Sequence, residues 1–188
     1  MNFAGRITLS RLMCLMVRQN FPCACEKGIN DQIKKELQAS YDYMAIAYYF
    51  NRSDIALPGM FKFFKHASDE ERQHAELFMD YQNKRGGTIE LQDIEAPNKK
   101  VTSIKEAMVE ALRMEKEVNQ SLLDLHATAT NENDPNLCDF LEANFLSEQV
   151  EAQKQLADYI TQIERCNEEL GDFIFDKKLA KSGSVHKE

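Results

Sequence analysis

Apolar residues recur every three or four positions along most of the chain, which is the spacing of one face of an α-helix. The pattern predicts four long helices and a short amphipathic fifth, over about residues 28–50, 58–84, 103–129, 135–166 and 169–179. Asp134 is suited to cap the fourth helix, and Pro135 to occupy its first position. We therefore expect an all-α protein.

The segment between the second and third helices, about residues 87–102, has no helical period and includes Pro97. It is longer than a tight turn between antiparallel neighbours needs, so we expect a crossover connection. A crossover makes the second and third helices parallel. Four long helices with one such connection predict a four-helix bundle.

The inward-facing stripe of each long helix carries polar side chains near its middle. They are Glu36 and Tyr43, Glu71 and His74, Glu115, and Gln149. Burying an unpaired carboxylate costs on the order of several kcal/mol, and divalent cations offset that cost by taking the oxygens as ligands. A Glu-x-x-His pair such as Glu71 and His74, with facing glutamates, is the ligand pattern of di-iron carboxylate bundles. The stripes together predict a metal centre.

Each of these residues also has an ordinary explanation when it is taken alone. A Glu-x-x-His pair arises often by chance, and Glu36 or Glu115 alone would more often face solvent or an ion-pair partner. Tyr43 on an apolar stripe is usually a core tyrosine with a satisfied hydroxyl. The metal interpretation therefore depends on the convergence of the stripes.

The composition argues against several other functions. The chain has 23 basic and 31 acidic residues and a net charge of −8, whereas phosphate binding needs clustered lysine and arginine, so we expect no nucleic acid partner. No apolar run approaches the roughly 20 residues of a membrane span, so we expect no membrane partner either. The five cysteines lack the spacing of a disulfide framework and are expected as thiols in a reducing compartment.

Residues 1–25 differ in composition from the rest, because they are basic, amphipathic and without an acid before Glu26. This is typical of a mitochondrial transit peptide, and a disordered or unprocessed arm explains it equally well. Cys23 and Cys25 are expected as thiols in that arm. We expect a domain over residues 26–180 and a disordered tail over 181–188. The protein is then intracellular, in the mitochondrion if the arm is a transit peptide and otherwise in the cytoplasm.

Several runs of sequence resemble animal ferritin heavy chains. They are KELQASYDY (35–43), DEERQHAE (69–76), NKRGG (83–87), LQDI (91–94), VNQSLL (118–123) and NDPNLCDF (133–140). The resemblance covers about Val17 to Lys178 and implies a ferritin-like four-helix bundle with one long crossover and a short fifth C-terminal helix. It also implies a subunit that oxidises Fe(II) with O2 at a di-iron centre and stores the ferric product in a hollow shell. The shell would have twenty-four subunits, possibly including other ferritin chains, and no organic cofactor.

The resemblance assigns roles to the matching positions. The implied residues of the di-iron centre are Glu36, Glu71, His74, Glu115 and Gln149, with Tyr43 hydrogen-bonded beside them. Glu70 would assist iron transfer, and Glu70 and Glu76 would nucleate mineral. The residues implied to line the pore through which Fe(II) enters are His126, Cys138, Asp139 and Glu142. Acids at the start of a helix also favour its dipole, which is the ordinary explanation for the last two.

Three features of the sequence refine the resemblance. Gln73 stands where the family often has glutamate, so we expect slower mineral nucleation. The turn around residues 166–168 lacks the expected Gly and Pro, which leaves the geometry near the fifth helix open. The fourth helix has Gln149 and Ala152 where di-iron oxygenases carry a second Glu-x-x-His. This predicts one weaker iron position and favours ferritin over an oxygenase, while the retained ligands disfavour a non-catalytic storage subunit.

Overall fold

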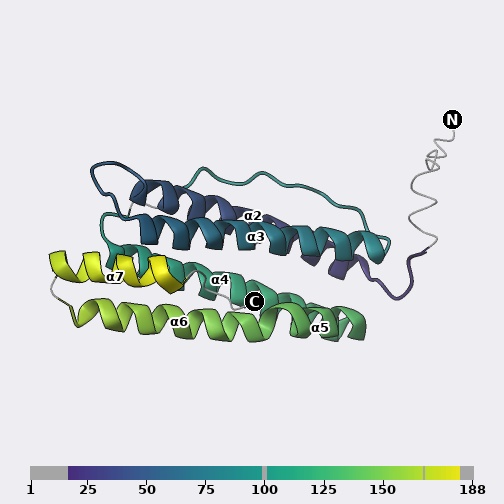
Figure 1. Cartoon of the computed structure of the whole chain (residues 1–188). Helices are drawn as coiled ribbons and strands as arrows, with labels where there is room; N and C mark the ends of the chain where they lie inside the picture. The colour runs from purple at the N-terminus through teal and green to yellow at the C-terminus, as the bar shows by residue number, and fades with distance from the viewer. Residues whose placement is uncertain (1–16, 99–100, 167, 183–188) are drawn as a thin grey trace.

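The computed structural model describes residues 17–98, 101–166 and 168–182, and every regular element in those ranges is a helix (Figure 1). The elements are α2 (Cys23–Phe50), α3 (Pro58–Lys84), α4 (Ile104–Asn131), α5 (Pro135–Leu141), the π-helix η1 (Glu142–Leu146), α6 (Ser147–Glu164) and α7 (Glu168–Ser182). Long helices lie alongside one another, and α7 packs mainly on α3. The predicted all-α bundle is confirmed. Among the described helices, none combines the length and apolar character that a membrane crossing requires.

The first helix begins earlier than the sequence pattern predicts. The side chains of Phe21 and Cys25 are buried, at 5% and 0% exposure, so the expectation that Cys25 is a thiol of the N-terminal arm is wrong, and Cys25 belongs to α2. Arg18 explains the difference, because it pairs with Glu26 and lies 5.0 Å from the Phe21 ring centroid. These contacts fix the chain ahead of α2, and apolar periodicity does not register them.

The predicted arm and the predicted tail, on either side of the domain, lie mostly outside the described part of the chain. Residues 1–16, which hold most of the predicted arm, lie outside the described residues, as do residues 183–188 of the predicted tail. Helix α7 continues to Ser182, so it includes the first two residues of the tail.

The predicted crossover connects the end of α3 to the start of α4, and it runs in extended form alongside α2 (Figure 1). Two amide side chains of α2 pair with its backbone as a neighbouring strand would. Asn30 Nδ2 donates to Thr88 O, and Asn30 Oδ1 accepts from Glu90 N, both at 3.0 Å. Gln38 does the same with both backbone groups of Glu95, at 3.1 and 2.6 Å. Side chains thus hold a connection whose described residues form no regular structure of their own.

The predicted stripes form the core, since their residues are buried, except that His74 is half-buried. The fourth helix differs from the prediction because η1 interrupts it. Phe145, within η1, stacks on Phe78 with 4.5 Å between centroids and meets the His74 ring edge-on. A π-turn inserts an extra residue per turn and occurs often beside functional sites. It brings an aromatic ring against the half-buried histidine.

Helix α7 is joined to the start of α3 by a buried carboxylate. Asp176, which is 1% exposed, accepts hydrogen bonds from the backbone N–H groups of Gly59 and Met60 at 2.6 and 3.0 Å. A Cβ at Gly59 would lie 2.0 Å from the Asp176 carbonyl oxygen, so only glycine allows this approach. Asp176 therefore caps α3 from another helix and positions α7.

Candidate metal centre

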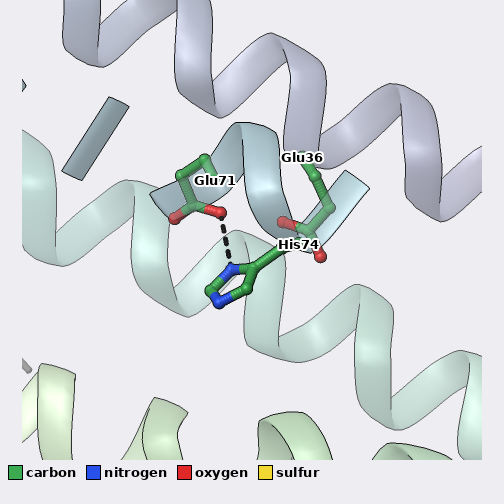
Figure 2. Close-up of side chains that lie close together, drawn as sticks. All are labelled: Glu36, Glu71 and His74. Atoms are coloured by element: carbon green, nitrogen blue, oxygen red, sulfur yellow. Dashed lines mark hydrogen bonds and ion pairs between the residues drawn. The ribbon is translucent and has the colours of Figure 1, made fainter. Parts of the chain in front are cut away.

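Three predicted ligands converge where α2 and α3 lie side by side. One ligand atom from each of Glu36, Glu71 and His74 lies within 4.8 Å of the others. His74 Nδ1 is 3.3 Å from Glu71 Oε2, which follows from their spacing of three residues on one helix. Figure 2 shows this pair on α3, with Glu36 approaching from α2. Two carboxylates and one imidazole thus share one position in the bundle.

The electrostatics of this cluster call for a positive charge. Burial raises the pKa of Glu36 well above its ordinary range, and the charge of Glu71 raises it further. Burial and the charge of Glu115 likewise raise the pKa of Glu71. Glu36 Oε2 is buried and meets no hydrogen-bond donor from the described residues. A proton or a cation must separate such carboxylates.

His74 supplies part of that charge when it is protonated. Burial lowers the pKa of His74, but its hydrogen bonds to Glu148 and Glu71 outweigh burial and raise the pKa to about 11. Its Nε2 is 3.2 Å from Glu148 Oε1, in addition to the Glu71 contact of Nδ1. A metal ion that takes a ring nitrogen as ligand would replace a proton there.

A second position faces the same cavity from the other side of the bundle. Glu115, on α4, accepts hydrogen bonds from the Tyr43 hydroxyl and from Gln149 Nε2, the latter at 2.9 Å. Burial raises the pKa of Glu115, although both hydrogen bonds oppose that effect. The cavity has a volume of about 20 Å³, and its polar lining includes Glu71, His74, Glu115 and Gln149. Tyr43 also lines this cavity, whereas Glu36 joins the set through its position beside Glu71 and His74.

Two residues of the site were missed by the sequence analysis. Glu148 contacts His74 from α6 but lies off the inward stripe, so periodicity excludes it. Gln32 is buried on α2 and donates to Glu36 Oε1 at 2.8 Å. Its position one helical turn before Glu36 could have indicated that it contacts this ligand. Glutamine itself, however, is not part of any metal-binding sequence motif that would draw attention to it.

The two predicted nucleation acids lie in different surroundings. Glu70 lines the cavity and is 3.3 Å from His66 Nε2. Burial and the charge of Glu148 raise the pKa of Glu70 to about 7. Glu76 lies on the exposed face of α3 and pairs with Arg72 at 2.7 Å. Only Glu70 is continuous with the candidate centre.

The four predicted pore residues line one surface groove of about 580 Å³ near the start of α5. They are His126, Cys138, Asp139 and Glu142. His126 Nε2 lies 2.7 Å from Glu142 Oε1, which joins α4 to η1. The structure brings these side chains together, and their role in iron passage stays a prediction.

A helical bundle with one long crossover and a core of glutamates around a histidine has the architecture of the metal-binding carboxylate bundles. The ferritin family, described as a ferritin-like domain, matches residues 26–166. The chain is 56% identical over 169 residues to soma ferritin of Lymnaea stagnalis, covering 89% of this chain and 97% of that protein. It is 51% identical over 161 residues to ferritin-2 heavy chain of Schistosoma mansoni (85% and 94%) and 49% identical over 165 residues to the ferritin middle subunit of Salmo salar (86% and 94%). The chain belongs to the ferritin family.

Proposed function

We propose that this chain is a catalytic, heavy-chain-type ferritin subunit that oxidises Fe(II) with O2 and deposits ferric oxyhydroxide inside a protein shell. The observation that carries the proposal is the buried cluster of Glu36, Glu71 and His74, with Glu115 facing the same cavity. Ferritin heavy chains of Schistosoma mansoni and Echinococcus granulosus, each 51% identical to this chain, support the heavy-chain type.

The donor set suits iron as a substrate. Carboxylate oxygens with one imidazole favour Fe(II) over softer metals, which prefer thiolates. Glu36, Glu71 and His74 would hold one ion and Glu115 the other, with Gln149 close by. Two Fe(II) ions give up one electron each, so a pair reduces one O2 to hydrogen peroxide with two protons. Tyr43 keeps the Glu115 carboxylate oriented toward the cavity.

The two metal positions differ in their number of ligands, and this difference suits a site through which iron passes. Three side chains can hold the first ion, whereas Glu115 would hold the second beside Gln149. Glu148, the carboxylate that α6 adds to the cavity lining, contacts His74 of the first position. We propose that iron leaves the weaker position past Glu70, toward mineral that Glu70 and Glu76 nucleate. Fe(II) would arrive through the groove at His126 and Glu142.

The storage function requires a container. We propose that copies of this chain, alone or with other ferritin chains, form a hollow shell of twenty-four subunits. We also propose that it works inside the cell, and in the mitochondrion if residues 1–25 act as a transit peptide.

The double variant Glu71→Lys with His74→Gly tests the function. We expect the initial rate of Fe(II) oxidation in air to fall at least about 100-fold, because two ligands of one position are lost. The matched control is Asp80→Lys, which places the same new charge on the exposed face of α3 and should keep the rate. Gel filtration verifies assembly of each variant. An unchanged rate in the double variant would reject the catalytic function and favour a storage subunit without catalysis.

A further inference from the structure

A buried glutamine connects the candidate ligand Glu36 to the opposite side of the bundle. Gln32 is 1% exposed and lies one turn before Glu36 on α2. Its Nε2 donates to Glu36 Oε1 at 2.8 Å, and its Oε1 accepts from Ser121 Oγ of α4 at 2.6 Å. Burying a primary amide is unfavourable unless its polar atoms are paired, and both ends of this amide are paired.

The order of donors along this chain of hydrogen bonds fixes its direction. The amide nitrogen of Gln32 donates to the Glu36 carboxylate, and the amide oxygen accepts from the Ser121 hydroxyl. The flipped amide would present an oxygen to Glu36, where two acceptors would meet without a proton. The Glu36 carboxylate, which when ionised can only accept, therefore selects the amide nitrogen of Gln32, and Ser121 pairs with the amide oxygen that is left.

The hydrogen bond from Gln32 makes the two oxygens of the Glu36 carboxylate different. Oε1 is occupied by Gln32, while Oε2 is buried with no donor from the described residues. An amide that fixes one oxygen restricts rotation of the carboxylate about its last side-chain bond. The second oxygen is thereby left for the position that Glu36 shares with Glu71 and His74.

We propose that Gln32 and Ser121 are positioning residues that orient the Glu36 carboxylate so that Oε2 serves as its metal-binding oxygen. The proposal rests on the function proposed above, because it requires that Glu36 bind a metal ion. Outer hydrogen bonds to ligating carboxylates commonly set their direction, and their loss typically costs about 10–100-fold in metal affinity or activity. A merely structural link between α2 and α4 would instead change stability and leave the metal site as it is.

Co(II) binding to the assembled, metal-free protein separates these two roles. Absorption bands of Co(II) report both the occupancy of a site and the geometry of its ligands. The Co(II) titration curve of the Glu36→Gln variant is subtracted from that of each other protein, which leaves the binding that depends on Glu36. The near-isosteric Gln32→Met should raise the dissociation constant of that site about 10–100-fold and change the band shape. Ser121→Ala should produce a smaller change in the same direction. Ser121→Thr keeps a hydroxyl, so this variant should bind Co(II) as the wild type does.

The matched control is Gln38→Met, the same substitution two turns further along α2, where the amide pairs with the crossover at Glu95 instead. It should leave the Co(II) bands and affinity unchanged. Wild-type affinity and band shape in Gln32→Met, alongside a lost site in Glu36→Gln, would overturn the positioning role alone. If Gln32→Met does not fold, unchanged bands in Ser121→Ala overturn it. A wild-type protein with no Glu36-dependent Co(II) site would overturn the proposed function as well.

Discussion

The two sides of the candidate centre solve the problem of buried charge differently. On the α2 and α3 side, Glu36 and Glu71 are buried together, and one oxygen of Glu36 meets no donor from the described residues. On the α4 and α6 side, both oxygens of Glu115 accept hydrogen bonds, from Tyr43 and Gln149. The first side therefore depends on a proton or cation, whereas the protein itself satisfies both oxygens of the Glu115 carboxylate on the second side. A metal ion should be held more strongly by the first.

The most direct way to break this asymmetry is to complete the ligand set on α6. Gln149→Glu with Ala152→His would create a second Glu-x-x-His, because both residues line the cavity. We expect the second position to hold metal on the order of 100-fold more tightly, since two ligands are added. Iron retained after anaerobic loading and passage over a chelating resin measures the gain. Oxidation should then stall after the first turnover because the product leaves slowly.

The single variant Gln149→Glu is the control for this design, since it adds a charge without the imidazole. It should give an intermediate gain. Iron retention in the double variant equal to that of the wild type would mean that ligand number does not set the difference between the two sides.

Removing one negative charge from each side in turn should affect the metal-free protein unequally. In Glu36→Gln the new amide can donate to Glu71 while its oxygen accepts from Gln32, so we expect stabilisation of about 1–3 kcal/mol at neutral pH. In Glu115→Gln one acceptor replaces two, which leaves one of the donors Tyr43 and Gln149 unpaired. We expect no gain there, or a loss of about 1 kcal/mol.

Thermal unfolding in the presence of a chelator measures both variants under the same conditions. The midpoint should rise for Glu36→Gln and stay level or fall for Glu115→Gln. Equal shifts would show that the hydrogen bonds to Glu115 do not compensate for its burial.

The bundle and most residues of the candidate centre could be predicted from the sequence because both depend on helical period. The core stripes of the first three long helices and the spacing of Glu71 and His74 follow from 3.6 residues per turn. Glu148 and the π-turn around Phe145 could not be predicted in this way. Glu148 reaches His74 from outside the stripe, and a π-turn results from packing between helices. The position of the chain ahead of α2 depends likewise on tertiary contacts, such as those of Arg18 with Glu26 and Phe21.

The pairing of Gln32 with Ser121 shows a further limit of sequence analysis. The two residues lie on different helices, and neither glutamine nor serine indicates a metal site by itself. Their role depends on the direction of two hydrogen bonds, and only coordinates show that direction. Ligands can thus be predicted from a pattern, but the groups that orient them cannot.

The smallest effect concerns Glu70, an α3 acid whose pKa of about 7 results from burial and from the charge of Glu148 on α6. Its ordinary pKa is 4.5, so the unfolded chain loses this proton at lower pH than the folded protein does. The metal-free protein should therefore lose stability as pH rises from 4.5 to 7, with a constant penalty above that. Glu70→Gln removes this loss, so its melting temperature should match the wild type near pH 4.5 and exceed it by about 2–4 °C near pH 7.5.

Glu76→Gln controls for the loss of one negative charge on the exposed face of α3. If the difference in melting temperature between Glu70→Gln and the wild type does not depend on pH, the Glu70 carboxylate is as well solvated in the folded protein as in the unfolded chain. In that case the carboxylates that require a cation include Glu36 and Glu71 but not Glu70.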